Sequence, residues 1–163
     1  MRILTYVLLV GGAITIMSST TREAGFSIGN KPGDLAPRIG LLQNEGCLNF
    51  KNDSTEYVLL QFWAAYDATS RAENVKLYNE IQKRADSKLK MVSVSFDEFA
   101  SVYNETVKLD NLNAASTYQE KSGASSPLYK EYGLDAGFKN FLIDKNGVIV
   151  ATDITPQQLS KII

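Results

Sequence analysis

The residue types that most often carry catalysis are scarce in this chain. None of its 163 residues is a histidine, which excludes a Ser-His-Asp triad, a Cys-His pair and a histidine-ligated zinc site. Cys47 is the only cysteine, so neither an intramolecular disulfide nor a dithiol active site can form. Because Cys47 falls in a predicted strand and not at a helix start, it fits a small buried residue. The alternative is an unpaired thiol, open to redox sensing or an intermolecular disulfide.

The acidic residues do not supply the missing chemistry. Asp97, Glu98 and Asp144 are candidate oxygen ligands, but their spacing is not that of a calcium loop, and Asp144 fits a turn better. We therefore predict no metal site and no cofactor. The 17 basic and 18 acidic residues give a net charge of −1, without the basic block that a dedicated nucleic-acid binder needs.

The elements that must position these residues alternate between strands and helices. The pattern predicts a hairpin (39–42, 47–50), strands (57–63, 91–96, 115–118, 141–143, 148–150) and helices (72–84, 98–109, 126–132, and one from 155). Such alternation favours right-handed crossovers and a parallel sheet centre. The Asn146-Gly147 turn adds an antiparallel hairpin. The predicted fold class is therefore α/β, in three layers with a mixed sheet.

The first 24 residues have the composition of an export signal. Arg2 precedes an uncharged stretch over 3–17, and a polar run follows it, which is the pattern of a secretory signal peptide. Residues 3–21 are also about long enough to span a bilayer once. We therefore expect a signal peptide or N-terminal membrane anchor over 1–24 and one domain over 25–163, exported to the periplasm or anchored facing it.

Four segments carry a resemblance to a known family. They are Gly-Asp-Leu-Ala-Pro (33–37), Gln-Phe-Trp-Ala (61–64), Tyr-Gly-Leu (132–134) and Phe-Leu-Ile-Asp-Lys-Asn-Gly (141–147). In this order and spacing, the chain resembles the thioredoxin-like envelope oxidoreductases of the TlpA/ResA type from residue 33 to its end. The resemblance implies a thioredoxin-like three-layer sandwich and descent from a thiol-disulfide oxidoreductase.

The chain departs from that family where the chemistry would occur. The family places Cys-x-Pro-Cys at a helix start after Phe-Trp-Ala-x-Trp, whereas this chain has Asp67 and Ser70 in place of the cysteines and Thr69 in place of the proline. By the same comparison, Phe138 occupies the place of the family's cis-proline. Gln61 stands where thioredoxin has a buried acid. The resemblance thus implies an inherited scaffold without its dithiol.

Asp67 is expected to cap the helix that begins at this site. A helix N-terminus lowers the pKa of a family cysteine, and an aspartate there keeps the anion while removing the nucleophile. We predict that its carboxylate accepts the backbone N–H of Thr69 or Ser70. The alternative is that Asp67 and Ser70 contact a ligand in the cleft where the family's dithiol would lie, hereafter the vestigial cleft. Covalent catalysis by Asp67 lacks a visible base.

Phe138 leads to two alternatives for the neighbouring loop. A cis bond before a non-proline residue costs about 3–4 kcal/mol, so the Gly137-Phe138 bond is expected to be trans. One hypothesis is a reshaped groove in which Phe138, Tyr66 and Trp63 form an aromatic surface. The other is that Phe138 only packs over the position left by the dithiol.

Three functions from different classes follow from these residues. The favoured one is a redox-inactive binding or accessory module for a protein or peptide of the cell envelope. Its candidate binding residues lie in the vestigial cleft: Trp63, Tyr66, Asp67, Thr69, Ser70 and Phe138. The alternative is a surviving oxidoreductase or peroxidase-like activity through Cys47 with an external thiol. A metal or small-molecule binder using oxygen ligands is the third.

Overall fold

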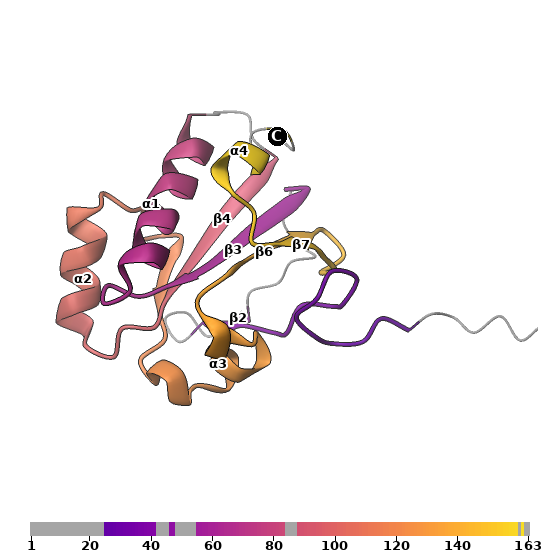
Figure 1. Cartoon of the computed structure of the whole chain (residues 1–163), viewed down its shortest axis with the longest axis horizontal. Helices are drawn as coiled ribbons and strands as arrows, with labels where there is room; N and C mark the ends of the chain where they lie inside the picture. Colours follow the sequence, from indigo (N-terminus) through magenta and orange to yellow (C-terminus); the bar gives the residue numbers. More distant parts are fainter. Residues whose placement is uncertain (1–24, 42–45, 48–54, 84–87, 160, 162–163) are drawn as a thin grey trace, which may run out of the picture.

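A five-stranded mixed sheet forms the centre of the molecule (Figure 1). The structure is a computed structural model that describes residues 25–41, 46–47, 55–83, 88–159 and 161. The strands lie in the order β5-β4-β3-β6-β7 and are β3 (Tyr57–Trp63), β4 (Leu89–Ser95), β5 (Thr117–Gln119), β6 (Asn140–Asp144) and β7 (Ile149–Thr152). Strands β3, β4 and β5 are parallel, while β6 and β7 are antiparallel to their neighbours. The predicted mixed sheet is confirmed.

Helices cover both faces of this sheet. One face carries α1 (Ala68–Gln82), α2 (Ala100–Leu109) and α4 (Pro156–Leu159); the other carries α3 (Pro127–Glu131) and the 3-10 turn η2 (Leu134–Ala136), with η1 (Gly123–Ser125) preceding α3. The apolar residues of each helix settle this assignment, because they join separate clusters on the two faces of β3 and β4. The predicted three-layer α/β architecture is confirmed.

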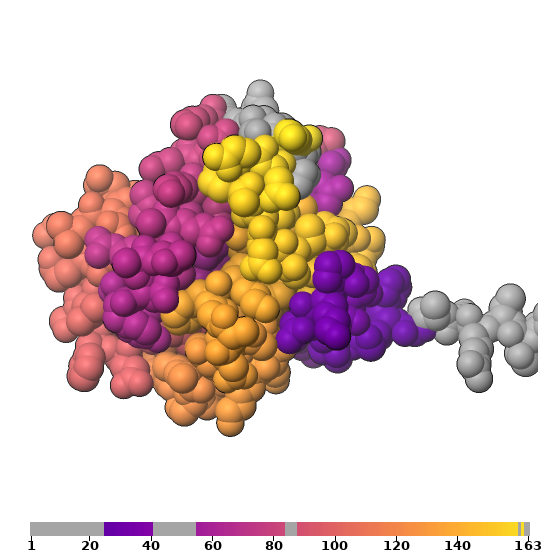
Figure 2. Space-filling view, in the orientation of Figure 1, coloured from indigo at the N-terminus to yellow at the C-terminus, as the bar shows by residue number. Residues whose placement is uncertain are grey.

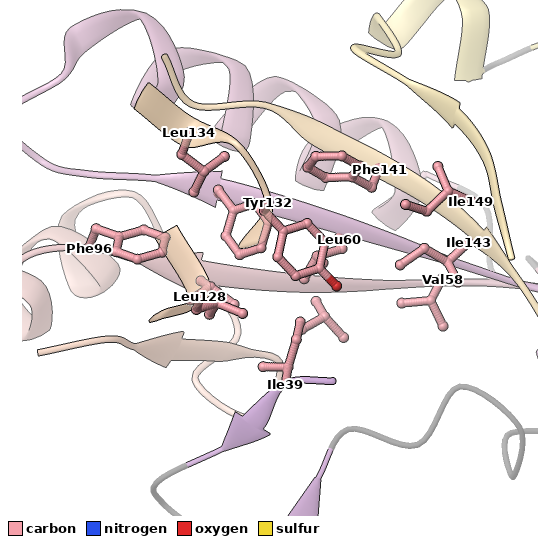
Figure 3. Packing of buried hydrophobic residues seen from close by; sticks show 13 residues of the cluster. Ile39, Val58, Leu60, Phe96, Leu128, Tyr132, Leu134, Phe141, Ile143 and Ile149 are labelled. Carbon is pink, nitrogen blue, oxygen red and sulfur yellow. The ribbon is translucent and has the colours of Figure 1, made fainter. Parts of the chain in front are cut away.

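Strand β3 is buried on both faces, which explains its nearly continuous apolar sequence. Successive strand side chains point to opposite faces. Leu60 therefore packs with Tyr132 and Phe141 on the α3 side (Figure 3). Phe62 joins the same cluster, whereas Trp63 packs with α2 on the other side. The end of β3, from which the candidate site begins, is thus held by both clusters.

The segment over residues 25–40, indigo in Figure 2, lies beside the yellow C-terminal part of the surface, and its backbone pairs with the outer edge of β7. The N–H of Gly33 donates to the carbonyl of Ile149 (2.8 Å), and the N–H of Ile149 donates to the carbonyl of Asp34 (2.9 Å). These bonds pair an edge that would otherwise present free backbone groups.

Asp144 shapes the turn between β6 and β7. Its carboxylate accepts the backbone N–H groups of Asn146 (2.8 Å) and Val148 (2.9 Å). Gly147 adopts a φ of +84°, which glycine tolerates without a Cβ penalty. The predicted Asn-Gly turn and the turn role of Asp144 are confirmed, although only Gly147 uses a positive φ.

Two further predictions concern segments near the start of the chain. The predicted hairpin is present as β1 (Gly40–Leu41) paired with β2 (Gly46–Cys47), while the rest of that hairpin, 42–45 and 48–50, lies outside the described residues. So does the predicted leader, 1–24. Among the residues that the structure does describe, no helix combines the length and apolar character needed to cross a bilayer.

Candidate functional site

Asp67 caps α1, as predicted. Its backbone is extended, and its carboxylate accepts the N–H of Ser70 at 2.7 Å. Its main-chain carbonyl accepts the N–H of Arg71 at 3.0 Å, and its own N–H donates to the carbonyl of Ala64 at 3.1 Å. The carboxylate therefore satisfies a helix N–H that would otherwise have no partner.

Ser70 lies beneath this cap, in the first turn of α1. Its side chain is 3% exposed, and its hydroxyl donates to the carbonyl of Asp67 at 3.2 Å and accepts the N–H of Ala64 at 3.4 Å. Thr69, between the two, is exposed. Asp67 and Ser70 thus bond to each other's backbone and close the helix start, where a nucleophile would need to be free.

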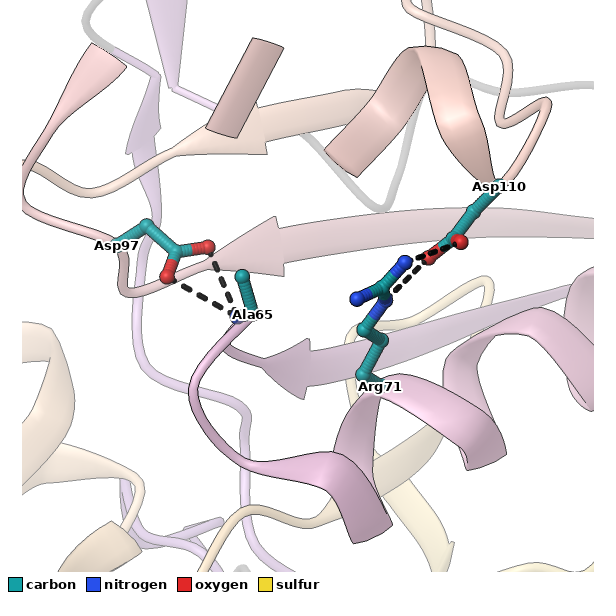
Figure 4. A network of polar contacts seen from close by, with 4 residues as sticks. All are labelled: Ala65, Arg71, Asp97 and Asp110. Carbon is teal, nitrogen blue, oxygen red and sulfur yellow. Dashed lines mark hydrogen bonds and ion pairs between the residues drawn. The ribbon is translucent and has the colours of Figure 1, made fainter. Parts of the chain in front are cut away.

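Asp97 fastens the connection between β3 and α1 to the end of β4 (Figure 4). This carboxylate is 3% exposed, and both of its oxygens lie 3.0 Å from the backbone nitrogen of Ala65, which donates to them. The hydroxyl of Ser95 donates to the same carboxylate at 2.7 Å. Asp97 thereby fixes the segment that carries Tyr66 and Asp67.

An ion pair links the start of α1 to the end of α2. The guanidinium of Arg71 donates two hydrogen bonds to the carboxylate of Asp110, at 2.7 and 2.8 Å (Figure 4). This bidentate pairing raises the pKa of Arg71. Because the guanidinium of Arg71 is already paired with Asp110, it does not neutralise the negative charge of the nearby Asp67.

Aromatic rings gather beside the start of α1, but Trp63 is not among them. Phe138 stacks on Phe96 with ring centres 5.8 Å apart, and lies 6.1 Å from Tyr129 and 6.2 Å from Tyr66. The prediction that Trp63 shares this surface is wrong: its side chain is wholly buried in the cluster beneath α2. Trp63 is still within β3, whose alternation turns it inward, whereas Tyr66 follows the end of the strand and is 70% exposed.

The loop before β6 presents Phe138 to this cluster. None of the described peptide bonds is cis, so the Gly137-Phe138 bond is trans, as predicted. Phe138 is half-buried, since it packs on Phe96 and Tyr129 on one side and reaches Tyr66 on the other. This arrangement combines a packing role with a contribution to the surface.

Tyr66 has a negatively charged neighbourhood. The pKa of its hydroxyl is raised, first by partial burial, then by Tyr129 and by the carboxyl groups of Asp97, Asp67 and Glu98. Neighbouring anions oppose the formation of a phenolate. The surface around Tyr66 therefore favours a neutral or positively charged contact.

Gln61 lies in β3, two residues before the end of that strand. Its side chain is wholly buried, and its amide donates to the carbonyl of Phe62 at 2.7 Å. An amide does not titrate. The position beneath the helix start therefore offers no carboxyl group to accept a proton.

A pocket opens between Tyr66, the connection from β4 to α2, and η1. It encloses about 420 Å³ and is lined by Tyr66, Phe96, Asp97, Glu98, Phe99, Val102, Gly123 and Ala124. This pocket was not predicted from the sequence, although the sequence contains two signals for it: an acid directly after a buried strand, and a phenylalanine where a helix begins.

The remaining candidate residues give less. Cys47 lies in β2 opposite Gly40, and whether its thiol is buried or reactive stays a prediction. In the part of the chain that the structure describes, no group of three or more cysteine, aspartate and glutamate side chains could hold a metal ion. The Asp97 carboxylate accepts hydrogen bonds from Ala65 and Ser95, and the Asp144 carboxylate accepts the N–H of Asn146 in the turn between β6 and β7.

A five-stranded mixed sheet of this order, with α1 starting at Ala68 shortly after the central strand ends at Trp63, is the arrangement of a thioredoxin-like fold. The chain is 49% identical to a thioredoxin-like protein from Parabacteroides distasonis, covering 82% of this chain and 95% of that one with a TM-score of 0.74. The chain belongs to the thioredoxin-like family, as the sequence predicted.

More distant solved structures share the fold. The thioredoxin domain of a thiol-disulfide oxidoreductase from Bacteroides vulgatus is 24% identical, with a TM-score of 0.66 over 80% of this chain and 94% of that one. A thiol:disulfide interchange protein from a Bacteroides species is 23% identical, with a TM-score of 0.65 over 83% and 87%. No family model and no curated protein sequence matches the chain.

Proposed function

We propose that this protein is a redox-inactive thioredoxin-like domain that binds a segment of a partner protein at the cell envelope. The observation that carries the proposal is the state of the α1 start, where Asp67 and Ser70 stand in place of the two cysteines and bond to each other's backbone. Thiol-disulfide exchange needs a thiolate to attack and a second thiol to resolve the mixed disulfide. Neither group is present there.

The surroundings of this helix start support binding. Tyr66 and Phe138 supply aromatic area, and Asp67 and Thr69 supply polar groups at the surface. Trp63 and Ser70 are buried, so they contribute no surface to this site. An aromatic patch beside a few fixed polar groups is typical of surfaces that recognise another protein.

The proposed location rests on the leader and on the family. The apolar stretch over 3–17 fits a signal peptide, and the fold is shared with thiol-disulfide interchange proteins. Fractionation of cells that produce the full chain tests this location. Recovery in the cytoplasmic fraction with residues 1–24 intact would contradict it.

A disulfide-reductase assay with an external thiol tests the proposed loss of redox function. We expect the full chain to show no turnover above a protein-free blank, and Cys47→Ala to behave identically. The positive control is Asp67→Cys combined with Ser70→Cys, which returns two thiols to the start of α1 and is expected to gain turnover.

Two results would contradict the proposal. Turnover by the unmodified chain that disappears in Cys47→Ala would assign the activity to that thiol and favour the oxidoreductase alternative. Peroxide reduction that depends on Cys47 would favour the peroxidase-like form of the same alternative.

A further inference from the structure

The pocket between β4, α2 and η1, hereafter the α2 pocket, has an apolar wall and an open mouth. Val102 lines the wall along α2, and Phe96, which is wholly buried, lies behind the wall. Tyr66 and Phe99, which are 70% and 71% exposed, stand at the mouth. With about 420 Å³, the pocket has room for one large side chain of another molecule.

Exposed apolar residues concentrate at this pocket. In the described part of the chain, seven large apolar side chains are exposed, and three of them, Tyr66, Phe99 and Val102, line this one pocket. Single exposed apolar residues are common, but a group around one concavity is typical of a binding surface.

Phe99 also occupies a helix position that its side chain does not stabilise. It is the N-cap of α2, and its side chain makes no capping hydrogen bond. Serine, threonine, aspartate and asparagine stabilise this position, whereas apolar residues do not. The chain thus gives up helix stability and leaves an aromatic ring exposed at the same position, which favours a role for that ring outside the fold.

The charged residues of the α2 pocket are all acidic. Of its eight lining residues, Asp97 and Glu98 are acids and none is basic. Glu98 lies against Gly123, where a Cβ would come within 2.7 Å of its Oε1 atom. Asp67 adds to the negative charge near Tyr66, and Arg71 is already paired with Asp110.

We infer that the α2 pocket binds an extended segment of the partner that places a bulky apolar side chain beside a lysine or arginine. The apolar side chain fills the space beside Val102 and Phe99. The neighbouring cation meets Glu98 and the face of Tyr66, where carboxylate and ring quadrupole both attract it. This inference rests on the proposed function and specifies the partner's chemistry.

Amide NMR titrations of the full chain with three matched peptides test the inference. The peptides are Gly-Ser-Lys-Phe-Ser-Gly, the same peptide with glutamate in place of lysine, and the same peptide with alanine in place of phenylalanine. We expect the Lys-Phe peptide to shift the signals of Tyr66 and Phe99 and to bind about fivefold more tightly than either variant peptide. Raising the salt concentration should reduce its advantage over the glutamate peptide.

Two substitutions at the pocket separate the apolar and charged parts of the recognition. Phe99→Ser should weaken the Lys-Phe peptide about fivefold and at the same time raise the melting temperature, because serine caps α2. Glu98→Lys should reverse the preference between the lysine and glutamate peptides. The matched controls are Leu109→Ser and Glu105→Lys, exposed positions of α2 outside the pocket, which should leave all affinities unchanged.

The outcomes distinguish this inference from the proposed function. Equal affinity for the lysine and glutamate peptides, or equal effects of the pocket and control variants, would overturn the inference. Absence of binding by all three peptides would also overturn it. None of these results restores a thiol to the α1 start, so the reductase assay remains a separate test of the redox-inactive domain.

Discussion

Removing the Asp97 carboxylate should loosen the segment that carries the candidate site. The carboxylate holds the backbone N–H of Ala65 with both oxygens at 3.0 Å and the hydroxyl of Ser95 at 2.7 Å. It is 3% exposed, and Ser95 is wholly buried. Asp97→Ala therefore leaves two donors without this acceptor: the hydroxyl of the wholly buried Ser95 and the backbone N–H of the half-buried Ala65.

The expected loss of stability follows from the Asp97 carboxylate and its two donors, the Ala65 N–H and the Ser95 hydroxyl. A hydrogen bond to a charged partner contributes about 1.5–3 kcal/mol, and a buried donor left unpaired costs about 1–3 kcal/mol. Part of this is offset because a buried carboxylate no longer has to be desolvated. We expect Asp97→Ala to lower the free energy of unfolding by about 2–4 kcal/mol. Asp97→Asn keeps the volume and one acceptor oxygen, and should cost about 1–2 kcal/mol.

Urea unfolding and amide hydrogen exchange together test this reasoning. The amide of Ala65 should lose protection in Asp97→Ala beyond the change expected from global stability alone. Asp110→Asn is the control, because it weakens the ion pair with Arg71, in which the Asp110 side chain is 13% exposed and the Arg71 side chain 34% exposed. This substitution should lower the free energy of unfolding by only about 0.5–1 kcal/mol. A free energy of unfolding for Asp97→Ala within about 0.5 kcal/mol of the unmodified chain, or unchanged exchange at Ala65, would refute the reasoning.

Three further predictions concern stability. Asp67→Ala should lower the free energy of unfolding by about 1 kcal/mol, and Asp67→Asn by only a few tenths, in urea titrations, because asparagine also caps a helix; equal losses would contradict the capping role. Tyr132→Phe should cost about 1–2 kcal/mol by the same measurement, since the buried Tyr132 hydroxyl donates to the carbonyl of Pro37 at 2.8 Å, and no loss would show that this bond contributes little. The pKa of Glu73 is raised, first by burial and then by Asp153, so its charged form destabilises the native state at neutral pH. Glu73→Gln should therefore raise the melting temperature at pH 7, and the gain should vanish below about pH 4; a pH-independent difference would contradict this cause.

The strands and helices were largely predictable because the pattern of apolar residues along each element indicates which of its faces are buried. The run over 57–63 and the apolar periodicity of the helices located the central elements, although the sequence pattern began the first helix at residue 72 and the structure begins it at Ala68. The first turn carries Ala-Thr-Ser-Arg, which has no apolar stripe. It is helical because Asp67 caps it and Asp110 holds Arg71.

The candidate site was predictable in part. The position of Asp67 in the resemblance located the cap correctly, and glycine followed by phenylalanine was enough to expect a trans bond at Phe138. Trp63 was misplaced because its burial depends on α2, which comes from a distant part of the chain. The α2 pocket was missed for the same kind of reason: it joins Tyr66, Phe99 and Gly123 from three separate connections.

The sequence by itself determined which chemistry the protein lacks, because a chain with no histidine and one cysteine cannot assemble the corresponding sites in any fold. It also determined the layered α/β class, since local periodicity depends on which faces are buried. Only the tertiary structure decided which acid does what. Asp97 and Glu98 are neighbours in the chain, yet Asp97 is buried and accepts the backbone N–H of Ala65, whereas Glu98 is exposed and lines a pocket. That difference arises from the packing of segments distant in sequence, which no local pattern contains.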